Sequence, residues 1–203
     1  EKQIRESVKR ILRTKYEYIG KNAGQLKGKS AEGSMLPIPR REASAFFSQQ
    51  AFRSASLLFR ERQIRVPLEN EKILLAGQHK AFFDEGLKRF PKARTYYFPS
   101  TPFYTAQESE LESFPAATEG FDVIIFCASN PASMQMLKTI ETGKHRVIIL
   151  SVLSPAYFND IKWPESGVAV YGTGKESFAA GFAAIAGDFV PEGTVPLALK
   201  EKE

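Results

Sequence analysis

A glycine-rich segment, residues 172–177 with the sequence Gly-Thr-Gly-Lys-Glu-Ser, has the composition of a phosphate-binding turn. It lies between an apolar run and an alanine-rich stretch, where a strand would pass into a helix. A P-loop needs its first glycine at the position that Ala169 occupies. A dinucleotide-binding Gly-x-Gly-x-x-Gly pattern also fails, because Ser177 stands where the third glycine should be. We therefore interpret the segment as a tight turn that requires small residues.

Two histidines and one cysteine are further residues whose types could do chemistry. His79 follows a predicted strand at the edge where ligands bind in open α/β sheets, whereas His145 precedes a strand at the opposite edge. Neither has a cysteine or carboxylate at metal-ligand spacing, so no metal site is predicted. Cys127 ends an apolar strand, and we interpret it as an inert buried residue. A single cysteine also excludes an internal disulfide.

Asn130 has two interpretations. It follows the most apolar predicted strand at the same edge as His79, where it could contact a ligand. Asn130-Pro131 is also the pair expected at a helix N-cap and first helical position, and we favour this second interpretation. Asn130 and His79 are kept as candidate binding residues. Because no Gly-x-Ser-x-Gly elbow and no catalytic carboxylate pair is found, the motifs predict no catalytic residue and no cofactor.

The elements that would position these residues follow from a regular alternation along the chain. Apolar runs that are continuous predict buried strands at residues 72–76, 95–98, 122–127, 146–150 and 168–171. Helical stretches follow them at residues 81–90, 107–117 (a helix or a loop), 131–142, 156–161 and 176–185, and a further helix is predicted at 42–57. This alternation is typical of a parallel sheet covered on both faces. We predict a doubly wound α/β domain of five to six strands in the flavodoxin-like order 2-1-3-4-5, with an extra edge strand or hairpin within residues 56–66.

The first 41 residues differ from the rest. Apolar residues at helical spacing predict an amphipathic helix in residues 1–20, with a stripe made of Ile4, Val8, Ile11, Leu12 and Ile19. Residues 21–41 lack an apolar period and contain glycines and prolines, so they are interpreted as a linker to the α/β domain at 42–203. Because an exposed stripe of this kind would promote association, we expect the helix to pack on its own domain or on a neighbouring copy.

Composition excludes several classes of protein. The chain has 203 residues, with 28 basic and 23 acidic side chains and a net charge of +5. The N-terminal charges occupy solvated helix positions, which does not favour nucleic-acid binding. No apolar run approaches the roughly 20 residues of a membrane span. The start, Glu-Lys-Gln-Ile-Arg, is not a signal peptide and has no initiator Met, so we interpret the chain as part of a longer protein; nothing in it indicates a compartment.

Three places in the chain together resemble the C-terminal domain of family 3 glycoside hydrolases. Residues 4–15 (Ile-Arg-Glu-Ser-Val-Lys-Arg-Ile-Leu-Arg-Thr-Lys) look like the helix that leaves that family's catalytic barrel. Residues 51–58, followed by Val-Pro-Leu at 66–68 and the strand at Ile73, resemble the start of its second domain. Residues 187–197 are similar to its ending, Gly-x-x-x-Pro-x-Gly-Lys-Leu-Pro, with Thr194 in place of the usual Lys.

The resemblance implies where catalysis would occur. The family's nucleophile is an Asp on the barrel, which lies outside these residues. The β-glucosidase-like branch takes its acid/base Glu from the segment after the strand corresponding to residues 122–127, and this chain has Ala128-Ser129-Asn130 there. The β-N-acetylhexosaminidase-like branch takes its acid/base from a His-Asp pair on a barrel loop. The missing Glu therefore favours the second branch.

The expected function is that of a non-catalytic C-terminal domain of a retaining enzyme acting on terminal β-linked N-acetylglucosamine. Its partner would be the barrel of the same polypeptide, through which it would meet carbohydrate, and it would stabilise that barrel or wall its cleft. The chain alone is expected to be inactive. The alternative is a free-standing flavodoxin-like module that binds a small ligand at the edge containing His79 and Asn130.

Overall fold

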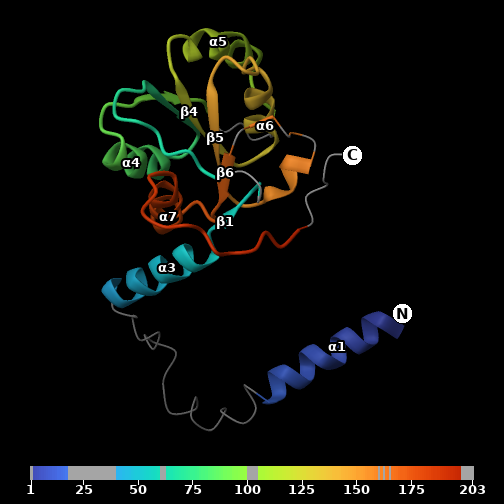
Figure 1. Cartoon of the computed structure of the whole chain (residues 1–203). Coiled ribbons are helices and arrows are strands. Elements are labelled where there is room, and N and C mark those ends of the chain that lie inside the picture. Colours follow the sequence, from blue (N-terminus) through green and yellow to red (C-terminus); the bar gives the residue numbers. More distant parts are fainter. Residues whose placement is uncertain are drawn as a thin grey trace. The chain divides into compact units, whose positions relative to one another are not determined.

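The computed structural model describes residues 2–17, 40–59, 63–99, 105–159, 161, 163–164 and 166–197. The chain divides into two compact units, Glu1–Glu42 and Ala43–Glu203, which are described separately. The first contains the predicted N-terminal helix, α1 (Lys2–Lys15) (Figure 1). Its apolar side chains are exposed, Ile4 by 68% and Leu12 by 60%. Its predicted end near Gly20 and most of the predicted linker lie outside the described residues, so the packing of this helix stays a prediction.

The second unit is built on a six-stranded sheet with the order β1-β6-β5-β4-β2-β3. Its strands are β1 (Ser56–Leu57), β2 (Ile73–Gly77), β3 (Arg94–Tyr97), β4 (Val123–Ala128), β5 (Arg146–Ser151) and β6 (Ser166–Ala169). Five strands are parallel, and β1 pairs antiparallel with β6 at one edge. The predicted order 2-1-3-4-5 and the extra edge strand are therefore confirmed. The apolar segment around Ile64 is not a strand.

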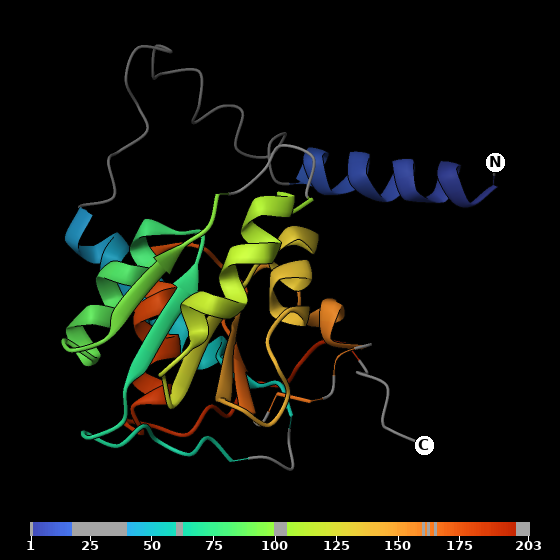
Figure 2. The same ribbon diagram turned by 90° about the horizontal axis from the view of Figure 1, so that it is seen from above.

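Helices cover both faces of this sheet (Figure 2). One face carries α4 (Lys80–Arg89) and α7 (Lys175–Ile185), and the other carries α5 (Glu108–Thr118), α6 (Pro131–Lys138) and a 3₁₀-helix at Pro155–Asn159. A further helix, α3 (Arg40–Ser54), precedes β1. The helix predicted at 131–142 ends early, at Lys138, with Thr139 as its C-cap.

Aromatic side chains fill both interfaces between sheet and helices. Phe82 of α4 contacts Phe178 and Phe182 of α7, with ring centroids 5.8 and 5.1 Å apart. On the other face, the rings of Phe98 and Phe126 stack at 5.6 Å. All of these rings are buried. Complete burial of both faces explains why the apolar strands are continuous rather than alternating.

The segment after α7 closes the domain beside β1. Gly187 has a φ of +81°, which ends the helix, and Pro191 is buried. The Gly193 amide donates to the carbonyl oxygen of Ala55 at 3.0 Å. A Cβ at Gly193 would lie 2.5 Å from the same oxygen, so no other residue fits there. The glycines and the proline of the chain's last motif thus have physical reasons in this fold.

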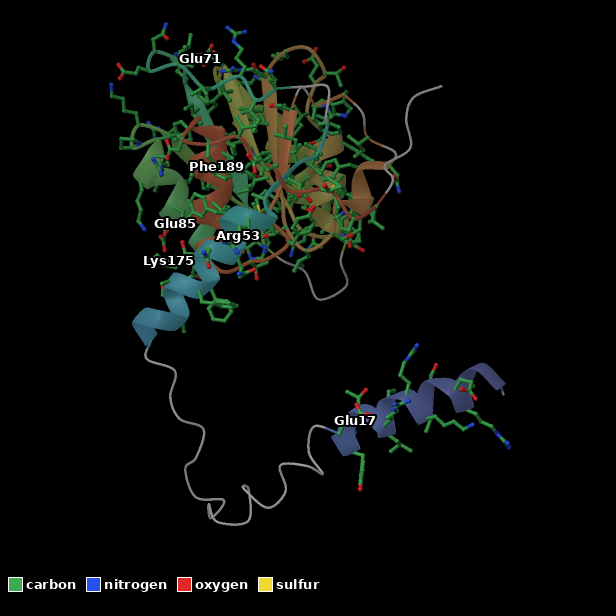
Figure 3. The ribbon with its side chains drawn as sticks, turned by 60° about the horizontal axis from the view of Figure 1, so that its bottom comes forward. Glu17, Arg53, Glu71, Glu85, Lys175 and Phe189 are labelled. Atoms are coloured by element: carbon green, nitrogen blue, oxygen red, sulfur yellow. The ribbon has the colours of Figure 1, made fainter. Side chains whose placement is uncertain are left out.

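At the amino edge of the sheet, one ion pair holds the irregular segment that precedes β2. Arg146, at the start of β5, is 8% exposed on its side chain and bonds Glu71, which is 18% exposed. The same guanidinium donates to the carbonyl oxygen of Arg65 at 2.9 Å, and Glu71 also accepts from the amide of Leu68 at 2.7 Å. Figure 3 labels Glu71 at the end of the sheet away from α3.

We expect Glu71→Gln to lower the free energy of unfolding by about 2–3 kcal/mol, because it leaves the buried guanidinium of Arg146 without its counter-charge. Urea unfolding measures the change. Glu69→Gln is the matched control, since Glu69 is exposed two positions away, and we expect a change within about 0.5 kcal/mol. Equal effects of the two substitutions would contradict the role given to the ion pair.

Candidate functional site

The carboxyl edge of the sheet brings together the polar residues that follow β2 and β4. Gln78 and His79 follow β2, and Ser129 and Asn130 follow β4, its parallel neighbour. The Ser129 hydroxyl donates to Gln78 Oε1 at 2.7 Å, and Gln78 Nε2 donates to the carbonyl oxygen of Pro99 at 3.3 Å. One amide side chain thus ties the loops after β2, β3 and β4 together.

Asn130 caps α6. Its Oδ1 accepts from the amide of Ser133 at 2.9 Å. The Ser133 hydroxyl accepts from the amides of Ser129 and Asn130, at 2.9 and 3.0 Å, and donates to the carbonyl oxygen of Asn130 at 2.6 Å. The cap favoured from the sequence is therefore confirmed, and Asn130 is only 7% exposed. Side chains within the turn therefore accept from its backbone amides, and neither Ser129 nor Asn130 provides a carboxylate.

His79 lies at the N-cap of α4 without a side-chain hydrogen bond to that helix. Its ring centroid is 5.8 Å from that of Phe178, and its buried Nε2 has no partner among the described residues. Burial lowers the pKa of His79 below its usual value of 6.5, so the imidazole is neutral at pH 7. His79 packs on the α4–α7 face whereas Asn130 caps a helix of the other face. The two candidates therefore share an edge of the sheet but lie on opposite faces of it.

The glycine-rich segment forms the short connection between β6 and α7. A Cβ at Gly172 would lie 2.7 Å from Ser177 Oγ, and Gly174 is the N-cap of α7, so the predicted tight turn is confirmed. Tyr171 has a φ of +57°, a conformation that costs about 1–3 kcal/mol outside glycine. Its hydroxyl donates to Ser56 Oγ at 3.0 Å, which fixes the ring against β1.

Two of the cavities that the described residues form adjoin the sheet. One, of about 300 Å³, lies between α3 and the turn after β6, with Phe47, Gln50 and Tyr171 among its lining residues. The other, of about 390 Å³, lies at the amino edge near Ile73 and Phe90. Neither is lined by His79 or Asn130.

The remaining candidates are structural. His145 is buried at the amino edge, with Nδ1 2.8 Å from the carbonyl oxygen of Phe121. Cys127 is fully buried in β4, and burial raises the pKa of its thiol, as its interpretation as an inert residue requires. In the part of the chain that the structure describes, no cluster of three or more His, Cys, Asp or Glu could hold a metal ion. Among the described helices, none has both the length and the apolar character needed to cross a bilayer.

Sequence reasoning missed three residues that build this edge. Ser133 could have been found from its spacing, because Asn130-x-x-Ser133 places a polar side chain at the third helical position, as a capping box requires. Gln78 gives no local signal, since its partners Ser129 and Pro99 are distant in sequence. Tyr171 gives none either, because its left-handed backbone is held by the contact with Ser56.

Comparisons with known proteins find similarity among solved structures. No family model matches the sequence, and no curated protein matches it significantly. Among solved structures, the chain is similar to a family 3 β-N-acetylglucosaminidase from a Paenibacillus species, with a TM-score of 0.66 and 13% identity over 84% of this chain and 35% of that one. It is also similar to a β-glucosidase from Listeria innocua in complex with isofagomine (TM-score 0.62, 15% identity, 89% and 30% covered). A fungal multi-domain family 3 β-N-acetylglucosaminidase gives a TM-score of 0.62 at 14% identity, with 85% and 21% covered.

At these identities the likeness concerns the fold. The chain spans about a fifth to a third of the length of these structures. It has the fold of the part of family 3 glycoside hydrolases that it covers, and the resemblance stated from the sequence is confirmed at that level.

The cap network yields a prediction about stability. We expect Ser133→Ala to lower the free energy of unfolding by about 1–3 kcal/mol, because the amides of Ser129 and Asn130 lose their acceptor in a buried turn. Asn130→Ala should cost about 1 kcal/mol, whereas Asn130→Asp keeps the capping oxygen and should cost less. Thermal and urea unfolding measure these changes. Ser109→Ala, on the exposed side of α5, is the control, and a loss as large as that of Ser133→Ala would refute the network's importance.

His79 yields a prediction about pH. Its pKa is lower in the folded than in the unfolded chain, so the unfolded state binds more protons below about pH 6.5. The contribution of neutral His79 to the free energy of unfolding is present above about pH 6.5 and is lost as the pH falls through the pKa of the folded state. Urea unfolding at about pH 7.5 and 5.5 measures how much the free energy of unfolding falls on acidification. The decrease should be smaller in His79→Gln than in the wild type, since the variant lacks the titrating ring. An identical pH dependence in both proteins would contradict this role.

Proposed function

We propose that the chain is the non-catalytic C-terminal domain of a retaining family 3 glycoside hydrolase that acts on terminal β-linked N-acetylglucosamine. The observation that carries the proposal is the fold, which matches a part of several family 3 enzymes over 84–89% of this chain. The matched part leaves most of each enzyme's length uncovered. A catalytic barrel preceding this domain in the same polypeptide would account for that remainder.

The turn between β4 and α6 supports the choice of branch. The comparisons include both β-N-acetylglucosaminidases and β-glucosidases, so the fold does not distinguish them. A domain that supplied the acid/base would need a carboxylate at this turn, within reach of the substrate. Ser129 and Asn130 occupy the turn, and Ser133 satisfies its backbone amides internally. This geometry suits a domain whose partner barrel holds both catalytic groups.

In a retaining mechanism, one carboxylate attacks the anomeric carbon and a second group protonates the leaving oxygen and later activates water. Under the proposal both groups lie on the barrel, and the present domain acts by position. Its carboxyl edge would form one wall of the cleft. The Gln78–Ser129 hydrogen bond and the Asn130 cap would hold this edge rigid. Residues 1–20 would form the helix between the domains, and residues 21–41 the linker that follows it.

Activity measurements test the proposal. The chain alone should hydrolyse neither 4-nitrophenyl β-N-acetylglucosaminide nor the corresponding β-glucoside, because under the proposal both catalytic groups lie on the barrel. The complete polypeptide encoded by the gene should hydrolyse the first substrate with retention of configuration. Deleting residues 43–203 from that polypeptide should lower its thermal stability or its kcat/KM.

Four outcomes would count against all or part of the proposal. Turnover by the chain alone that a substitution in this chain abolishes would place catalysis here. A gene whose upstream sequence encodes no barrel would remove the partner. A large thermal shift of the chain with flavins or nucleotides would favour the free-standing module instead. Activity of the complete polypeptide on β-glucosides alone would keep the domain's role and overturn the branch.

A further inference from the structure

We propose that α1 docks in an apolar groove of the catalytic barrel and that carboxylates bordering this groove neutralise Arg5 and Lys15. The inference rests on the proposed function, because it takes the barrel of the same polypeptide as the partner of the helix, and it adds the chemistry of the surface that covers it. The starting observation is an uncovered apolar face. Four aliphatic side chains of α1, called here the α1 stripe, are 47–68% exposed: Ile4, Val8, Ile11 and Leu12.

Two cations share the face of the α1 stripe. Residues three or four positions apart are neighbours on the surface of a helix. Arg5 is three residues before Val8, and Lys15 is three residues after Leu12. The two cations therefore lie beside the stripe, one at each of its ends. A surface that covers the stripe must also accommodate these two charges.

The helix itself supplies no counter-charge to these two cations. Both carboxylates within residues 4–17 are used by other cations, at N–O distances of 3.3 and 3.0 Å, in the pairs Lys9–Glu6 and Arg13–Glu17. Arg5 and Lys15 form no ion pair with any residue that the structure describes. Covering a cation without a counter-charge is unfavourable, so the partner must supply the carboxylates. Because ten residues of helix span about 15 Å, we expect one carboxylate near each end of a groove of that length.

Charge also distinguishes the barrel from other surfaces that could cover the α1 stripe. Residues 4–17 contain five Lys or Arg side chains and two Glu, so two copies of the helix would repel each other. An anionic bilayer attracts basic amphipathic helices through cations all along their polar face. Here Glu6 and Glu17 neutralise two of those cations, which weakens that attraction. A protein groove with placed carboxylates fits better, because Arg5 and Lys15 need counter-charges at two defined points.

Hydrogen exchange of the α1 amides, measured by mass spectrometry, tests the proposal. These amides should exchange more slowly in the complete polypeptide encoded by the gene than in this chain alone. In the complete polypeptide, Arg5→Glu and Lys15→Glu should each speed their exchange about tenfold, because each substitution sets a carboxylate against a carboxylate. Arg5→Glu places an acidic residue near the start of the helix, which favours the helix by itself. Faster exchange in this variant therefore reports lost docking rather than a weaker helix.

Two further variants are the matched controls. Arg10 is exposed and has no member of the α1 stripe three or four positions away, so Arg10→Glu makes the same charge change on the other face and should leave exchange unchanged. Lys15→Arg keeps the charge and should keep the protection. The proposal is overturned if the α1 amides exchange equally in the complete polypeptide and in this chain alone, if neither reversal speeds exchange, or if Arg10→Glu acts as strongly as Arg5→Glu.

The other occupants have their own readouts in the complete polypeptide. Sedimentation with phosphatidylglycerol vesicles that Arg5→Glu abolishes would assign the α1 stripe to a membrane surface. A dimer in solution that Ile11→Asp dissociates would assign it to a second copy. Either result overturns the inference, and so does an upstream sequence without a barrel, which overturns the proposed function as well. Hydrolysis of 4-nitrophenyl β-N-acetylglucosaminide, measured in parallel, tests the proposed function alone, because the inference is judged by exchange.

Discussion

Burial of the central strands on both faces is the constraint from which the rest of the structure follows. Every residue of β4 is fully buried, and β5 beside it is almost so. Apolar side chains on both sides of a strand require a layer of helices on each face, which α4 and α7 provide on one side and α5 and α6 on the other. Polar side chains are then confined to the ends of the strands, because a buried polar group without a partner destabilises the fold. Any ligand chemistry must therefore occur at an edge of the sheet.

The two edges are held in different ways. At the amino edge, a charged pair between Arg146 and Glu71 connects the segment before β2 to the start of β5. At the carboxyl edge, neutral hydrogen bonds of Gln78 and Ser133 close the loops after β2 and β4. Neutral networks of this kind rigidify an edge without adding charge to it. Under the proposed function, this neutral edge would face the partner barrel.

The lateral edge of the sheet, formed by β1, is covered by short contacts. The edge strand β1 has only two residues, and Gly193 of the last segment approaches the chain beside it at Ala55. This arrangement covers the edge and anchors α3, which reaches across to α7 through Ser44. A helix attached at its ends leaves space beneath it, and the space is bounded by side chains from segments more than a hundred residues apart. The cavity with Phe47 and Tyr171 arises in this way.

Much of this protein was determined by its sequence alone. Continuous apolar runs such as residues 122–127 predicted the buried parallel strands, their order and the helices between them, because burial on both faces leaves a pattern that is local in the chain. Asn130-Pro131 likewise predicted its own cap. Only the tertiary structure decided that His79 and Asn130 lie on opposite faces, that Gln78 joins three loops, and that Phe47 and Tyr171 line one cavity. These contacts depend on how distant segments pack, and no short stretch of sequence records which distant segment its side chains will meet.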